Sequence, residues 1–169
     1  MKAGWKKWRE VTDVTYDKKL LLKLRIKVYK TVIRPVLLYG AETWALKKKE
    51  ERLLMRTEMR MLRWIMGISR REKKTNKSIK EMERVVGIEE KAREARLRWF
   101  GHVKRRREEE PSRRAMELNV PGRRKRGRQA KRWMDCVKED MKHRGMKEEC
   151  ALDRLMWRKA ARWDGGDPS

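Results

Sequence analysis

The sequence predicts an all-α protein, an irregular helical array in two loosely joined subdomains. Apolar residues recur every three or four positions along most of the chain, which is the spacing of amphipathic helices. Glycines and prolines stand between these periodic segments, where helices are expected to end. Only 38% of the residues are apolar and 44% are charged, so we expect small helix clusters, filled largely by eight Trp and eleven Met.

The first predicted helix covers about Asp17–Ile33, where two adjacent apolar stripes make a broad face. Pro35 disfavours helical geometry at Arg34, so we expect the helix to end there. The next segment, Val36–Gly40, is the most apolar short run of the chain. A strand is one interpretation, but no partner strand is in sight, so we favour a buried helical turn or an extended connector.

A second helix is predicted over about Lys47–Met66, because methionines and leucines recur on one of its faces. Gly67 stands where a left-handed C-terminal cap belongs. A short third helix follows, with Thr75 or Asn76 as its N-terminal cap. The fourth predicted helix covers about Glu89–Val103.

The last third of the chain predicts a short helix over Pro111–Leu118 and two longer ones over Arg128–His143 and Lys147–Trp163. Gly145 separates the two longer helices. The buried face of the last helix is predicted to carry Leu152, Met156 and Trp163.

The charged stretch at 105–111 marks a predicted domain boundary. Residues 1–104 hold most of the aliphatic residues, whereas residues 105–163 are more basic and thinner in apolar content. Residues 164–169 are predicted to be a disordered tail. We therefore expect two helical domains, 1–104 and 105–163, followed by this tail.

Positive charge is the strongest compositional signal. Fifty Lys and Arg face twenty-five Asp and Glu, which leaves a formal net charge of +25. Self-repulsion of this size opposes compaction, and a polyanionic partner relieves it. Nucleic acid, RNA or DNA, is the first candidate because each neutralised phosphate releases a counterion. An anionic membrane surface is the alternative.

The sequence favours an intracellular location, in the nucleus or the cytoplasm. Cys136 and Cys150 are too few for a disulfide framework, and reduced thiols are the expected state. Residues 1–10 lack the apolar core of a signal peptide, and no stretch approaches the roughly 20 apolar residues of a membrane-spanning helix. We expect no membrane association.

Catalytic and metal-binding patterns are missing from the sequence. No two aspartates are adjacent, and Glu108–Glu110 is flanked by arginines, as expected for a solvated, salt-bridged run. No Gly-rich phosphate loop is found. Cys136, His143 and Cys150 are each seven residues apart, which fits no zinc pattern. We expect no enzyme activity, metal, cofactor or small-molecule substrate.

Two basic clusters are the predicted nucleic-acid contacts. One is a glycine-flanked loop that leads into a helix, whose N-terminal amides favour phosphate. The other is a run of four cations after the fourth helix. The alternatives are a nuclear-localisation signal or a solvated surface. The predicted contacts are Lys104, Arg105, Arg106, Arg107, Arg123, Arg124, Lys125, Arg126, Arg128, Lys131 and Arg132.

Four segments in order carry a resemblance to a known family. They are Val28–Trp44, Met59–Gly67, Arg96–Val103 and, last, Pro121–Arg128 with the nearby Arg132–Asp135. Together they resemble the C-terminal end of the reverse transcriptase of LINE-type non-LTR retrotransposons, especially the RTE-like clade. The resemblance extends from about residue 5 to residue 163.

The resemblance implies a thumb-like helical segment followed by a basic C-terminal region that handles RNA or DNA. Nothing in the chain matches the paired aspartates of the family's palm domain. We therefore expect a non-catalytic, truncated fragment that binds the nucleic-acid backbone. The alternatives are a part that docks on a reverse transcriptase palm domain supplied by another chain, and a decayed reading frame without selected function.

Overall fold

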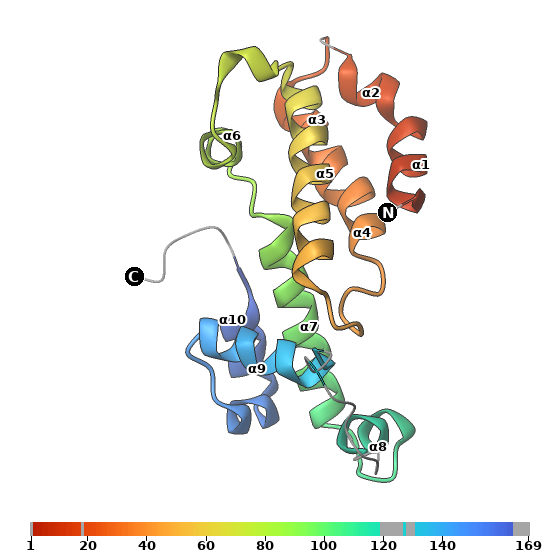
Figure 1. The fold of residues 1–169 in the computed structure, drawn as a ribbon, viewed down its shortest axis with the longest axis vertical. Helices are drawn as coiled ribbons and strands as arrows, with labels where there is room; N and C mark the ends of the chain where they lie inside the picture. The colour runs from red at the N-terminus through yellow and green to blue at the C-terminus, as the bar shows by residue number, and fades with distance from the viewer. Residues whose placement is uncertain (1, 18, 119–126, 128–130, 164–169) are drawn as a thin grey trace. The chain divides into compact units, whose positions relative to one another are not determined.

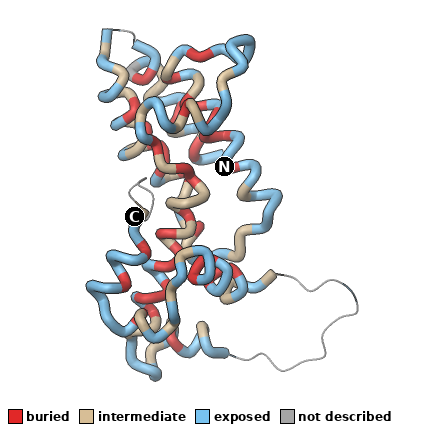
Figure 2. The backbone as a smooth tube through the Cα atoms, turned by 90° about the vertical axis from the view of Figure 1, so that its left-hand side faces the viewer, coloured by how far each residue is buried: buried red, intermediate tan, exposed pale blue. Residues whose placement is uncertain are grey.

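The computed structural model describes residues 2–17, 19–118, 127 and 131–163. All regular elements in this part of the chain are helical, and it contains no strand, which confirms the all-α prediction. Buried residues alternate with exposed ones along the helices, as amphipathic helices require (Figure 2). Within the same residues, no helix is long and apolar enough to cross a membrane.

The chain divides into two compact units. Unit 1 contains residues 1–40, 48–92 and 163–169, and unit 2 contains residues 41–47 and 93–162. Helix α7 (Ile88–Lys104) contributes its first turn to unit 1 and the remainder to unit 2. The boundary predicted from the sequence, between residues 104 and 105, lies inside unit 2, and the predicted tail at 164–169 lies outside the described residues.

Unit 1 is built around α5, its longest helix. Helix α3 contacts α5, and α1 packs against α4 (Figure 1). The sequence did not predict α1 and α2, which are short; α1 is rich in charged residues, and α2 has only five residues. The elements of unit 1 before α7 are α1 (Lys2–Glu10), α2 (Thr12–Tyr16), α3 (Leu22–Val28), η1 (Tyr29–Ile33), α4 (Arg34–Leu38), α5 (Lys48–Met66), η2 (Arg70–Glu72) and α6 (Asn76–Met82).

The predicted end of the first long helix at Arg34 was wrong. The chain forms a π-helical turn, η1, and then continues through Pro35 into α4. The Arg34 amide bonds the Tyr29 carbonyl, five residues back, and Arg34 keeps helical dihedral angles. A π-turn widens the helix, which makes room for the proline ring that would otherwise clash with a carbonyl one turn earlier. The run that follows is thus helical up to Leu38, as expected for part of Val36–Gly40, but only Leu37 within it is buried and Tyr39 is 92% exposed.

Helix α5 confirms the second predicted helix almost residue for residue. It ends at Met66, and Gly67 follows with a φ of +68°, the left-handed cap that the sequence predicted. The Ile68 amide bonds the Arg63 carbonyl and closes the capping turn. The predicted cap of α6 is confirmed too, because the Thr75 hydroxyl accepts a hydrogen bond from the Ser78 amide.

The inner face of α5 buries one charged residue, Glu58, which is 0% exposed. Its carboxylate accepts hydrogen bonds from the Tyr29 hydroxyl at 2.9 Å and from the Ile88 amide at 3.0 Å. It also pairs with Arg34 at 3.3 Å and with Lys80 at 3.4 Å. A buried carboxylate is tolerated only with such partners, so this cluster joins η1, α4, α5, α6 and the start of α7.

Unit 2 packs the rest of α7 against the C-terminal helices. Its remaining elements are α8 (Pro111–Glu117), α9 (Trp133–His143), η3 (Glu148–Leu152) and α10 (Arg154–Ala161). Trp157 is 1% exposed and donates its indole N–H to the Leu97 carbonyl at 2.7 Å. A Cβ on Gly101 would collide with that indole, so glycine at this position lets Trp157 approach α7. Phe100 packs between Trp133 and Trp157.

The last predicted helix, Lys147–Trp163, was wrong as a single element. It is divided into η3 and α10, because the Asp153 side chain accepts hydrogen bonds from two amides of the next turn and starts a new helix. The restart changes the buried face. Leu152 and Met156 are 65% and 61% exposed, and Trp157 and Ala161 are buried instead.

Candidate nucleic-acid interface

The predicted basic loop falls on residues that the structure does not describe. Of this group, only the end can be placed: Lys131 pairs with Glu139 at 2.5 Å, and the Arg132 amide donates to the Asp135 carboxylate at the start of α9. The loop residues Arg123, Arg124, Lys125, Arg126 and Arg128 lie outside the described residues.

The second predicted cluster, Lys104–Arg107, is largely occupied by partners within unit 2. Lys104 pairs with Glu148 at 2.7 Å, and Arg106 pairs with Glu110 at 2.8 Å. Arg105 donates to the Ala151 carbonyl at 2.6 Å, and partial burial lowers its pKa. Arg107 is exposed. Three of the four cations therefore have a structural role that competes with phosphate binding.

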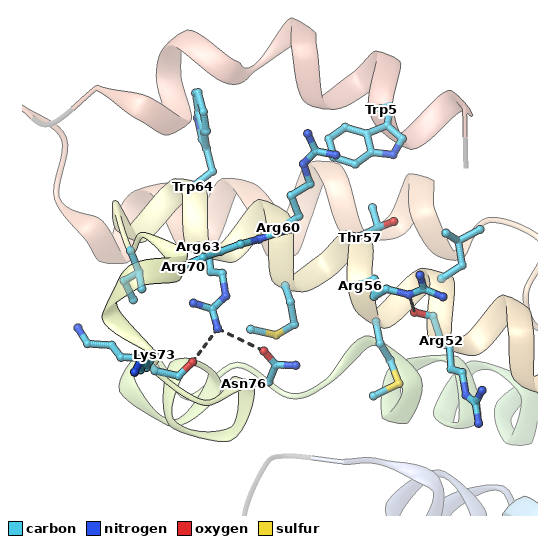
Figure 3. A pocket seen from close by; sticks show the side chains of 15 residues that line it. Trp5, Arg52, Arg56, Thr57, Arg60, Arg63, Trp64, Arg70, Lys73 and Asn76 are labelled. Carbon is cyan, nitrogen blue, oxygen red and sulfur yellow. Dashed lines mark hydrogen bonds between the residues drawn. The ribbon is translucent and has the colours of Figure 1, made fainter.

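Unit 1 contains a groove that sequence reasoning missed. Helix α5 forms its floor, α1 contributes Trp5 to one side, and the segment 70–76 contributes the other side (Figure 3). Seven lining residues are cationic and none is acidic. We call this the α5 groove. Its cations are Arg52, Arg56, Arg60, Arg63, Arg70, Lys73 and Lys74.

The arginines of the floor follow the helical repeat. Arg52, Arg56 and Arg60 are four residues apart, so they form a row with a spacing of roughly 6 Å along the helix axis, at 1.5 Å per residue. All three are exposed, and none forms an ion pair within the described part of the chain. Like charges four residues apart cost a helix roughly 0.2–0.5 kcal/mol per pair, a cost that a bound anion would offset.

Several contacts hold the groove cations in place. The Arg60 guanidinium lies over the Trp5 ring, 5.2 Å from its centroid. Arg63 donates to the Lys74 carbonyl at 2.7 Å and so ties α5 to the segment after it (Figure 3). Lys74 pairs with Glu72 at 3.1 Å. Side chains ordered in this way lose less conformational entropy when they bind a phosphate.

The reason for the missed groove is its discontinuity in sequence. The two predicted clusters are runs of adjacent cations, whereas the α5 arginines are separated by apolar and polar residues. The sequence of α5 nevertheless contained a signal. After Glu51, its one acidic residue is Glu58, which the helical repeat places on the inner face. Beyond its first turn, the outer face of the helix is therefore left with cations and no acid. The walls of the groove come from distant segments and carry no such signal.

The groove suits recognition of phosphate. Guanidinium groups bind phosphate oxygens through paired N–H donors, and a continuous row of them matches the repeating charge of a nucleic-acid strand. No group of three or more His, Cys, Asp or Glu placed to hold a metal ion occurs among the described residues. Cys136 is buried, which raises the pKa of its thiol, and His143 is exposed.

The fold and the groove thus define an all-helical protein with a cationic, acid-free groove along one helix of unit 1. Comparisons with protein-family models, curated proteins and solved structures found no match to this chain.

Proposed function

We propose that the chain is a non-catalytic nucleic-acid-binding protein that holds RNA or DNA by its phosphates in the α5 groove. The observation that carries the proposal is the row of exposed arginines, Arg52, Arg56 and Arg60, in a groove that has no acidic residue among those that line it. The net charge of +25 supports the same partner, because a polyanion relieves the self-repulsion.

The family resemblance of the sequence points in the same direction. In the proposed interpretation, unit 1 corresponds to the thumb-like segment of a LINE-type reverse transcriptase, and the basic residues that follow correspond to its C-terminal region. The motif segments Val28–Trp44 and Met59–Gly67 fall largely on η1, α4 and α5, the elements that form or support the groove. The fragment would then keep the grip on nucleic acid without the polymerase chemistry.

The proposal is tested by measuring affinity for an oligonucleotide over a range of salt concentrations. Wild type is compared with the triple variant R52Q/R56Q/R60Q. Because each lost phosphate contact reduces the slope of log K against log [salt] by about 0.7–0.9, we expect the slope to become shallower by about 2–3. At 0.1 M salt the affinity should fall on the order of 10²-fold.

A matched control is K138Q/K142Q/R158Q, which removes the same charge from exposed residues of α9 and α10 in unit 2. This control is expected to keep nearly the wild-type slope, because its three residues do not line the groove. Any effect of net charge alone would appear in both variants. Equal loss of affinity in the two triple variants would overturn the assignment of the α5 groove as the binding site.

A further inference from the structure

One lining residue of the α5 groove, Trp64, forms an aromatic pair with Tyr16, and both rings are about half exposed. The rings of Trp64 on α5 and Tyr16 on α2 lie with their centroids 5.2 Å apart and their planes tilted by 38°. Trp64 is 49% exposed and Tyr16 is 50% exposed. Trp64 lines the groove, one turn after Arg60, at the end of the arginine row (Figure 3).

Three other tryptophans, Trp5, Trp133 and Trp157, are engaged within the protein. Trp157 is buried against α7, and Trp133 donates its indole N–H to the Glu42 carbonyl at 2.7 Å. The other tryptophan of the groove, Trp5, is covered by the Arg60 guanidinium. Trp64 therefore differs from Trp5: both lie in the groove, but Trp64 carries no cation on its ring among the described contacts.

We propose that the α5 groove binds a strand with unpaired bases, and that Trp64 stacks on one of them while the arginine row holds the adjoining phosphates. This inference rests on the proposed function and specifies its substrate. Aromatic side chains beside a cationic track are the usual means of binding single strands, since every base offers a flat face for stacking. A fully paired duplex keeps its bases stacked inside and presents mainly phosphates to such a surface.

The position of Tyr16 supports this role of Trp64. Tyr16 lies against the indole from a different helix, so it restricts the orientation of the ring before any ligand arrives. A ring ordered in advance loses less conformational entropy when a base stacks on it. An indole that served only the core would be expected to lie buried, as Trp157 does.

The test compares wild type with Trp64→Leu and Trp64→Phe on five probes of equal length: a single-stranded RNA, a single-stranded DNA, the duplex of each and an abasic sugar–phosphate strand. We expect Trp64→Leu to lower the affinity for the single-stranded RNA, the single-stranded DNA or both roughly 10-fold or more, and to leave the duplexes and the abasic strand unchanged. Trp64→Phe keeps an aromatic face and should recover most of the affinity.

Trp44→Leu is the matched control, because Trp44 is 69% exposed and does not line the groove. Circular dichroism and urea unfolding confirm that each variant is folded. The inference is overturned if Trp64→Leu leaves single-strand affinity unchanged, or if it weakens all five probes alike. The proposed function fails differently: the groove triple variant would then bind no worse than its charge-matched control.

Discussion

The cations at the end of α7 and those along α5 are similar in chemistry and opposite in environment. In unit 2, Lys104 and Arg106 each pair with a glutamate, and Arg105 is bonded to a backbone carbonyl. In unit 1, Arg52 and Arg56 are exposed and have no carboxylate partner among the described residues. Availability of a cation therefore depends on where the carboxylates lie in the fold and not on the length of the basic run.

The acidic residues beside these two sets of cations also differ in burial, although unit 2 too buries one carboxylate, Asp140, against Arg96 at 2.6 Å. Unit 1 places Glu58 on the inner face of α5, where it serves Arg34 and Lys80. Unit 2 places Glu110 and Glu148 near its surface, where they neutralise neighbouring cations. Burying the acid of α5 leaves the outer face of that helix purely positive beyond its first turn.

The largest expected effect tests the buried acid of unit 1. Glu58→Gln removes the charge that balances Arg34 and Lys80, and breaking a buried ion pair typically costs about 3–5 kcal/mol. We expect the free energy of unfolding, measured by urea denaturation, to fall by about that amount. The control is Glu81→Gln, which removes an exposed partner 3.9 Å from Lys77 and should change stability by less than about 0.5 kcal/mol.

Equal stability of Glu58→Gln and wild type would show that the fold of unit 1 does not depend on a buried carboxylate at position 58. The comparison would then lose its basis, because the positive outer face of α5 would no longer follow from a structural demand on Glu58. We expect Glu58→Gln to lose stability while each folded molecule keeps the wild-type affinity for nucleic acid. That result would show that Glu58 has a structural role only.

A medium effect is expected from K104Q/R105Q/R106Q in unit 2. Charge-assisted hydrogen bonds contribute about 1.5–3 kcal/mol, whereas exposed ion pairs contribute at most about 1 kcal/mol, so most of the loss should come from the bond between Arg105 and the Ala151 carbonyl. We expect a loss of about 2–3 kcal/mol in unfolding free energy, measured in urea.

The nucleic-acid affinity of K104Q/R105Q/R106Q tests whether the cations at the end of α7 are as available as those of α5. If Lys104, Arg105 and Arg106 are held by their partners in unit 2, their removal should weaken nucleic-acid binding far less than removal of the three α5 arginines. A loss of affinity as large as that of the groove variant, measured at the same salt concentration, would contradict this view and restore the basic run as a contact site.

Sequence periodicity predicted much of the helical framework. The α5 helix, its Gly67 cap and the Thr75 cap of α6 were all correct, since each depends on interactions within a few residues. Pro35 was misinterpreted because a π-turn, which has no local sequence signature, accommodated it. Asp153 likewise divided a helix that periodicity alone continued.

The candidate site was harder to predict than the fold. Its floor is encoded by arginines one turn apart, but its walls come from Trp5 and from the segment 70–76, which only the tertiary structure brings to α5. Runs of adjacent cations are easily seen in a sequence, and a salt-bridged role for Glu110 was expected from its neighbours. The distant partner of Lys104, Glu148, is recognised only after folding. The basic loop before α9 stays a prediction.

The smallest effect concerns the pH dependence of unit 1. Burial, and after it the charge of Glu58, raises the pKa of Tyr29 well above its ordinary value of 10.0. Above pH 10 the phenol of Tyr29 ionises in the unfolded chain but stays protonated in the folded protein, so the folded state binds more protons. Stability contributed by Tyr29 is therefore complete below pH 10 and decreases as the pH rises, with a slope of at most about 1.4 kcal/mol per pH unit.

Tyr29→Phe isolates this contribution. The variant loses the hydrogen bond to Glu58, a cost of about 1 kcal/mol at neutral pH, but it has no phenol to titrate. Urea unfolding between neutral pH and pH 11 should therefore show a shallower decline for Tyr29→Phe than for wild type, so that the two curves converge. Tyr39→Phe, at a site that is 92% exposed, should run parallel to wild type. If the unfolding free energies of Tyr29→Phe and wild type declined in parallel with pH, water would have access to the Glu58 cluster. Glu58 would then be no more enclosed than Glu110 and Glu148 of unit 2.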